Sequence, residues 1–208
     1  MRLTGESKLF LGVTGASILL IAIAAIFFSR PAPVQPTLPK SELLGQQPHG
    51  KGNASASTYL VEFSDFQCPA CKAAKPFVDE VVEKNRERLF FVYRHFPLAQ
   101  HPFGLKAAIV AEAAGVQGKF WEMYDLLFTN QENLSEALFV DLAKQLNLNE
   151  KDFTDSLSDP KTKANVSLDR DYGLKIGVNS TPTFYLNGKK LILTSYSDIR
   201  VEVERALK

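Results

Sequence analysis

An uninterrupted hydrophobic segment lies near the start of the chain. Residues 9–28, LFLGVTGASILLIAIAAIFF, carry no charged side chain. At about 1.5 Å per residue, a helix of this length crosses the roughly 30 Å hydrocarbon layer of a membrane. A cleaved signal peptide is the alternative, but its small-residue cleavage signal, Ala22 and Ala24, would lie inside the segment rather than after it. We therefore predict a membrane-spanning anchor.

The next segment, residues 29–57, has no hydrophobic periodicity that could form a packed face. It is rich in proline, glutamine, glycine and serine, a composition typical of linkers. We predict a tether that holds the following domain away from the membrane.

Apolar patterns after residue 57 predict a β–α–β unit. Residues 58–63, TYLVEF, form a β-rich, mostly apolar run that is typical of a buried strand. Helix formers with apolar spacing follow over residues 69–88, and a second buried strand is predicted over residues 89–93. A crossover of this kind makes the two strands parallel and places the functional loop at the carboxyl end of the first strand.

The apolar spacing is then helical from about residue 98 to residue 176. Strand character returns at residues 183–186, Asn187-Gly188 is a strong hairpin-turn signal, and a strand resumes at residues 191–194. A last amphipathic helix is predicted from Asp198. This order predicts an α/β fold, a mixed sheet flanked by helices, with an all-helical subdomain inserted into it.

The charge balance excludes one class of partner. The 24 lysine and arginine residues and the 23 acidic residues leave no positive excess to hold a polyanion. We therefore expect no binding of nucleic acid.

Both cysteines of the chain lie in one motif, Cys68-Pro69-Ala70-Cys71, where the first predicted strand meets its helix. Residues three apart in a first helical turn face the same side, so the two sulfur atoms can approach bonding distance. Cys68 lies at the helix N-terminus, where free backbone amides and the helix dipole stabilise an anion. We predict that Cys68 is a thiolate nucleophile and that Cys71, one turn further on, is the resolving thiol.

Two other uses of the cysteines are less favoured. A structural disulfide would close a loop of only four residues, which a domain of about 150 residues does not need. A zinc site would need two more ligands from His49, His95 and His101, but His49 falls in the predicted tether and the spacing matches no compact zinc finger. We therefore predict a redox pair, with no metal and no organic cofactor.

A carboxylate precedes the motif by six residues. Glu62 lies within the otherwise apolar first strand, where burial should raise its pKa and make it able to relay a proton for Cys71. The alternative is that Glu62 faces solvent or pairs with a lysine.

Four segments of the chain, in this order, resemble segments of a known family. They are EFSDFQCPAC, RHFPLAQHP, KFWEMYDLLF and GVNSTPTFYLNGK. With them, the chain resembles the DsbA-like branch of the thioredoxin-fold thiol–disulfide oxidoreductases, in a membrane-anchored bacterial form. The resemblance covers about residues 58–208 and implies a thioredoxin fold with an inserted helical domain at about 98–176.

The resemblance also implies roles for particular residues. Cys68 and Cys71 match the redox pair, and Glu62 matches the buried acid. Pro182 matches the cis-proline that faces the active site, and Thr181 matches the preceding residue, whose backbone holds an extended substrate chain. One position departs from the pattern: strongly oxidising members carry histidine where this chain has Ala70, so we expect a milder oxidant, with a Cys68 pKa above about 4.

These expectations define a function. We predict an extracytoplasmic oxidase that donates the Cys68–Cys71 disulfide to exported, cysteine-containing proteins as they fold, and that a membrane redox partner resets. An oxidising compartment places the domain outside a bacterial cell membrane and the N-terminus, residues 1–8, in the cytoplasm. The chain would be single-pass and monomeric.

Two alternatives stay open. One is a reductase or isomerase on the same scaffold, kept reduced by a membrane electron donor. The other is a binding module or metal chaperone that does not use the cysteines for exchange. The redox state of Cys68 and Cys71 in the cell distinguishes the first, and the effect of Cys68→Ala distinguishes the second.

Overall fold

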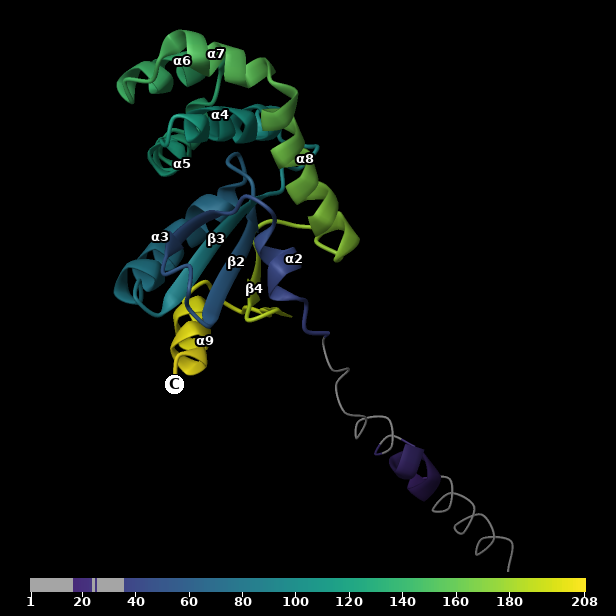
Figure 1. The fold of residues 1–208 in the computed structure, drawn as a ribbon. Coiled ribbons are helices and arrows are strands. Elements are labelled where there is room, and N and C mark those ends of the chain that lie inside the picture. The colour runs from purple at the N-terminus through teal and green to yellow at the C-terminus, as the bar shows by residue number, and fades with distance from the viewer. Residues whose placement is uncertain (1–16, 24, 26–35) are drawn as a thin grey trace, which may run out of the picture. The chain divides into compact units, whose positions relative to one another are not determined.

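The structure is a computed structural model of the chain that describes residues 17–23, 25 and 36–208. Residues 36–208 form one compact unit (Figure 1). Its elements are, in chain order, α2 (Lys40–Leu44), β1 (His49–Gly52), β2 (Thr58–Ser64), α3 (Pro69–Lys84), β3 (Leu89–His95), α4 (Gly104–Val116), α5 (Phe120–Thr129), the 3-10 helix η1 (Gln131–Asn133), α6 (Glu136–Gln145), α7 (Glu150–Ser158), α8 (Pro160–Lys175), β4 (Thr183–Leu186), β5 (Lys189–Lys190) and α9 (Asp198–Ala206).

A mixed sheet forms the centre of this unit. Its strand order is β1-β3-β2-β4-β5. Strands β2 and β3 are parallel, as the β–α–β pattern predicts, and the other neighbouring pairs are antiparallel. All residues of β2, β3 and β4 are buried, because helices cover both faces of the sheet.

Helices cover the two faces unequally. Alternate residues of the strands, such as Leu60 and Tyr93, pack in one apolar cluster with α3, α9 and the helices from α4 to α7. Their neighbours, such as Val61 and Val92, pack in a second cluster with residues of α2 and α8. Figure 1 shows α3 and α9 on one side of the sheet and α2 on the other. The helices α4 to α8 lie between β3 and β4, in the interval where the sequence predicts a helical insertion.

Part of the predicted tether is folded, so the prediction of a tether over 29–57 is wrong for residues 40–52. Helix α2 buries Leu43 against the sheet, and β1 pairs antiparallel with β3. The segment is also attached through backbone atoms, because the amide of Leu38 donates to the carbonyl of Gly188 at 2.8 Å. The folded domain therefore begins before residue 58.

The predicted hairpin differs in its second strand. Asn187 and Gly188 both have positive φ angles, 49° and 86°, which is the backbone of a tight hairpin turn. Strand β5 follows at once and ends at Lys190, so residues 191–194 are not a strand. The turn of two residues brings the chain back directly, which makes the second strand begin earlier than its apolar residues indicate.

Most of the predicted membrane-spanning segment, 9–28, lies outside the described residues, as does the predicted N-terminus at 1–8. Of that segment, residues 17–23 and 25 are described and are helical. Among the residues that the structure describes, no helix combines the length and the apolar character needed to span a bilayer.

Candidate active site

The two cysteines lie where β2 gives way to α3, at the carboxyl end of the first central strand. Cys68 is the residue that precedes the helix, and Pro69 begins the helix, where its missing amide hydrogen is not needed. The cysteines are reduced in this structure. Cys68 keeps 6% of its surface exposed and Cys71 none, so only Cys68 is open to a substrate.

The environment of Cys68 stabilises its thiolate. Its pKa is lowered to about 5, because the Cys71 thiol donates a hydrogen bond to it, which, together with hydrogen bonds from the Thr181 side chain and the backbone amides of Cys71 and Ala70, outweighs burial. This pKa agrees with the expectation of a value above about 4, which follows from Ala70 at the position where strongly oxidising members have histidine. Cys68 is therefore a thiolate at neutral pH.

Cys71 behaves in the opposite way. Burial, followed by the hydrogen bond to Cys68 and the nearby carboxyl of Glu62, holds the pKa of Cys71 well above that of a free thiol. The pair therefore consists of one reactive thiolate and one protonated thiol that supports it.

Glu62 is buried in the middle of β2 and is 1% exposed. Burial raises its pKa to about 8, because desolvation outweighs the hydrogen bond from Ser64 and the charge of Lys75, which lower it. One of its oxygen atoms, Oε2, has no hydrogen-bond partner among the described residues. Of the two sequence interpretations of Glu62, the structure supports the buried acid rather than the solvent-facing or lysine-paired carboxylate.

The Thr181–Pro182 peptide bond is cis and lies against the cysteines. The Sγ of Cys68 donates to the carbonyl oxygen of Thr181 at 3.4 Å, although the two residues are 113 positions apart. The Thr181 hydroxyl is buried and has no hydrogen-bond partner in the described part of the chain, so it is available to donate to Cys68 when that sulfur is ionised. The loop that contains Thr181 and Pro182 therefore forms one site with the two cysteines. The sequence indicated these two parts separately.

Two further residues fix the loop before the cysteines, and sequence reasoning missed both. Gln131 in η1 donates through Nε2 to the carbonyl oxygens of Phe66 at 2.8 Å and Cys68 at 3.0 Å. The buried carboxylate of Asp65 accepts from the amide of Gln67 at 2.8 Å. No local pattern indicates Gln131, because its partners are more than 60 positions away.

Asp65 also joins this loop to the segment that follows β3. Its Oδ2 accepts from the backbone amide of Leu98 at 2.8 Å and from Nδ1 of His101 at 2.7 Å. His101 is thus part of the support for the active-site loop. The position of Asp65, three residues before the first cysteine, was the available sequence signal.

The geometry of these groups supports thiol–disulfide exchange. A thiolate with limited exposure at a helix N-terminus, a buried thiol beside it and a neutral carboxyl nearby are groups that suit exchange between a dithiol and a disulfide. A backbone carbonyl next to the thiolate lies where an extended peptide could be held.

Comparisons with known proteins agree with this arrangement. The sequence matches the thioredoxin family over residues 45–205. Among solved structures, the thiol-disulfide exchange protein α-DsbA2 from Wolbachia pipientis is similar with a TM-score of 0.72 and 23% identity, covering 80% of this chain and 91% of that one. Oxidised BdbD from Bacillus subtilis is similar with a TM-score of 0.68 and 22% identity, covering 84% and 97%. At these identities the likeness shows the fold.

Curated relatives with higher sequence identity are named as Na⁺/H⁺ antiporters. A segment of the Na⁺/H⁺ antiporter NhaA 3 from Salinispora tropica is 38% identical over 143 residues, which is 68% of this chain and 22% of that protein. The NhaA 1 antiporter from Mycolicibacterium gilvum is 35% identical over 189 residues, 86% of this chain and 30% of that protein. The chain spans less than a third of the length of these relatives, so their transport activity is not transferred to it.

Proposed function

The chain belongs to the thioredoxin family and has the fold of its DsbA-like members, and on this premise we propose that it is a thiol–disulfide oxidase of an extracytoplasmic compartment. Its oxidised form would donate the Cys68–Cys71 disulfide to cysteine-containing proteins that fold outside the cytoplasm. The observation that carries this proposal is the contrast between the two sulfur atoms, a pKa of about 5 at Cys68 and a raised pKa at Cys71.

The contrast supports one direction of exchange over the other. A stabilised Cys68 thiolate favours the reduced form of the pair, and this makes the disulfide easier to give away. Each pKa unit corresponds to roughly 30 mV for a two-electron couple, so the lowered pKa makes the disulfide more oxidising by of order 100 mV. The geometry therefore favours an oxidase over a reductase on the same scaffold.

The reaction begins on the exposed sulfur. A thiolate of the substrate attacks Cys68, the Cys68–Cys71 bond breaks, and a mixed disulfide between substrate and Cys68 forms. Cys71 leaves as a thiolate and takes up a proton, for which the neutral Glu62 carboxyl is the nearby source. A second substrate thiolate then attacks the substrate sulfur of the mixed disulfide and releases the Cys68 thiolate. The substrate loses two electrons and the cysteine pair gains them.

Thr181 and Pro182 would hold the substrate during this step. The Thr181 carbonyl lies 3.4 Å from the Cys68 sulfur, where it could accept a hydrogen bond from an extended chain joined to that sulfur. Each cycle leaves the pair reduced, so the proposal includes a membrane redox partner that oxidises it again. The antiporter names of the curated relatives support a place at a membrane, since those proteins join a similar domain to a transporter.

The test is the redox state of the pair in living cells. Thiol alkylation of the full-length chain, after acid quenching, should show that most molecules hold the Cys68–Cys71 disulfide. The purified oxidised protein should also introduce disulfides into reduced, unfolded ribonuclease. A mostly reduced pool would contradict the oxidase assignment and favour the reductase or isomerase. Retention of the cellular function by Cys68→Ala would favour a binding module.

A further inference from the structure

A second cluster of reactive side chains lies apart from the cysteines. It consists of His49 in β1, His95 at the end of β3 and Glu112 in α4, which we name the His–Glu–His cluster. Their nitrogen and oxygen ligand atoms all lie within 4.8 Å of one another. We propose that this cluster binds a divalent transition-metal ion of the Zn²⁺ type. The proposal does not depend on the oxidase function.

The pairing of two distant segments builds the cluster. His49 lies opposite Tyr93 in the antiparallel pair of β1 and β3. Because side chains alternate along a strand, His95 shares the face of Tyr93 and is the diagonal neighbour of His49. Helix α4 places Glu112 between them: the Nε2 of His49 donates to its Oε1 at 2.5 Å and the Nε2 of His95 to the same oxygen at 2.9 Å.

Neighbouring side chains fix the orientation of each ligand. The ring of His49 stacks on Phe120 with centroids 3.4 Å apart and an angle of 1° between the planes. Asn165 in α8 donates through Nδ2 to Oε2 of Glu112 at 2.9 Å, which leaves Oε1 to face the imidazoles. Outer contacts of this kind hold metal ligands in place and contribute to affinity. The cluster is therefore arranged before any ion enters.

The chemistry of the three side chains selects the type of ion. Glu112 presents one carboxylate oxygen, Oε1, to the Nε2 atoms of both His49 and His95. Two imidazole nitrogens and one carboxylate oxygen are a ligand set of zinc sites that keep a fourth position open. Calcium and magnesium prefer oxygen ligands alone. An ion bound between the rings would take the place of the two Nε2 hydrogens that now point at Oε1 of Glu112.

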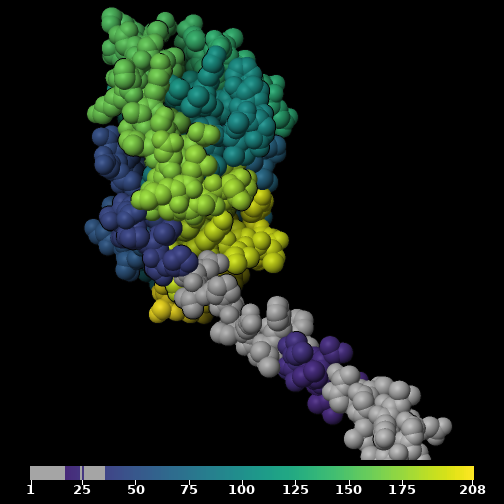
Figure 2. Space-filling model, turned by 90° about the vertical axis from the view of Figure 1, so that its right-hand side faces the viewer, coloured from purple at the N-terminus to yellow at the C-terminus, as the bar shows by residue number. Residues whose placement is uncertain are grey.

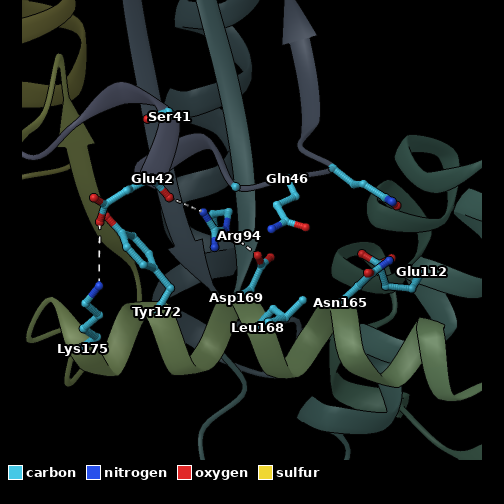
Figure 3. Close-up of a pocket in the computed structure, with 12 residues that line it drawn as sticks. Ser41, Glu42, Gln46, Arg94, Glu112, Asn165, Leu168, Asp169, Tyr172 and Lys175 are labelled. Carbon is cyan, nitrogen blue, oxygen red and sulfur yellow. Dashed lines mark hydrogen bonds and ion pairs between the residues drawn. The ribbon is translucent and has the colours of Figure 1, made fainter.

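A pocket lies beside the cluster, on the side of Glu112. This pocket of about 390 Å³ is lined by residues of α2, α8 and the loop between α2 and β1, and it reaches Glu112 and Asn165. Figure 3 shows Asn165 pointing towards Glu112 at one end of this pocket, with Gln46 above them. Figure 2 shows the face on which α8 lies beside the segment that contains α2. Water or a small anionic ligand could reach the fourth position from this pocket.

The experiment uses the oxidised full-length protein, in which Cys68 and Cys71 hold a disulfide and offer no thiolate. Titration with Zn²⁺ in a calorimeter should give one ion per chain, and the ion should raise the midpoint of thermal unfolding. His49→Gln should lose both effects, because it removes one ligand from a partly exposed position. His101→Gln is the matched control, since this histidine faces Asp65 instead, and it should bind Zn²⁺ as the wild type does.

Two results would overturn the proposal: a folded wild-type protein that binds no Zn²⁺ stoichiometrically, or unchanged binding by His49→Gln. Should His49→Gln fail to fold by circular dichroism, Asn165→Ala decides. It leaves all three ligands in place and should weaken binding about tenfold through the lost contact to Glu112; equal affinity would contradict the site. Co²⁺ absorption without a thiolate charge-transfer band should show that no cysteine is a ligand.

Discussion

Two glutamates of this protein are buried almost equally and ionise in opposite ways. Glu62 in β2 is 1% exposed and Glu112 in α4 is 6% exposed. Burial raises the pKa of Glu62 to about 8. Glu112 is also desolvated, but hydrogen bonds from two imidazoles lower its pKa below the usual range. Burial alone therefore does not set the charge of a carboxyl group; the donors that face it do.

The same rule separates the two cysteines. Cys71 is fully buried beside the Glu62 carboxyl and stays protonated, whereas Cys68, one helical turn away, is met by several donors and ionises. A neutral acid beside a neutral thiol suits proton transfer, and an ionised carboxylate between imidazoles suits a metal ion. The protein thus builds two chemically different sites on one sheet.

Replacing the sulfur of either cysteine by oxygen should have the largest effect, because it removes one member of the contrasting pair. Cys68→Ser removes the thiolate that forms the mixed disulfide, so disulfide exchange should fall to the background rate. Cys71→Ser keeps that thiolate but lacks the second sulfur, and it should accumulate mixed disulfides with substrates. Gel electrophoresis without reductant, after incubation with a disulfide-containing substrate protein, checks both. Equal amounts of mixed disulfide in the two variants would contradict separate roles for the two cysteines.

Removing the charge of Glu112 should cost stability. Glu112→Gln replaces the carboxylate that faces two imidazole N–H groups by a neutral amide, and a hydrogen bond to a charged group is worth about 1.5–3 kcal/mol. Urea unfolding at pH 7 without metal measures this loss. The rate of thiol exchange should not change in the folded variant, because Glu112 touches neither cysteine. A variant as stable as the wild type would show that the cluster contributes nothing to folding.

Removing the carboxyl of Glu62 should have the opposite effect on stability from removing that of Glu112. Its carboxyl holds a proton in the native state up to about pH 8, whereas the unfolded chain releases that proton near pH 4.3. The contribution of Glu62 to stability is therefore complete at low pH and is lost as the pH rises from about 4 towards 8, by about 4 kcal/mol at pH 7. Glu62→Gln should remove this decline, so that the oxidised variant is more stable than the wild type at pH 8.

Urea unfolding of the oxidised protein between pH 5 and pH 8 measures this difference, and the oxidised form keeps cysteine titration out of the comparison. Parallel pH profiles for wild type and Glu62→Gln would contradict a buried, neutral Glu62.

The smallest effect concerns a single donor to Cys68. Thr181→Val keeps the shape of the side chain but removes a hydroxyl that stabilises the thiolate. A hydrogen bond to a charged group is worth about 1.5 kcal/mol, so the pKa of Cys68 should rise by about one unit. Thr183→Val is the control, since that hydroxyl donates to the Ser180 carbonyl instead. The pH dependence of alkylation compares them, and equal pKa values would exclude the Thr181 hydroxyl as a donor.

Much of the fold and of the dithiol site follows from local sequence patterns. The strand before the cysteines, the helix after them and the turn at Asn187-Gly188 each carry their own signal, because turn and helix geometry depend on adjacent residues. Glu62 was recognisable as a charge within an apolar strand. The roles of Thr181 and Pro182 came from the family resemblance alone.

The rest depends on contacts between distant residues. Strand β1, HGKG, is short, has no apolar alternation and was placed in a tether; it becomes a strand only by pairing with β3. A histidine in a tether has no fixed position, so the sequence alone excludes His49 as a ligand and relates the three histidines only to the cysteines. Glu112 lies in an alanine-rich helix, and nothing in its surroundings along the chain indicates that two histidines meet it.

The pKa of Cys68 in the fully reduced protein tests the account most directly. The rate of alkylation by iodoacetamide, measured from pH 3 to pH 10, follows the thiolate fraction of the exposed sulfur. Cys71→Ser would replace the thiol that donates to Cys68 by a hydroxyl, so the measurement needs the wild-type pair, in which the buried Cys71 is protected. The account predicts a single transition near pH 5. A transition near pH 8.5, as in free cysteine, would contradict it.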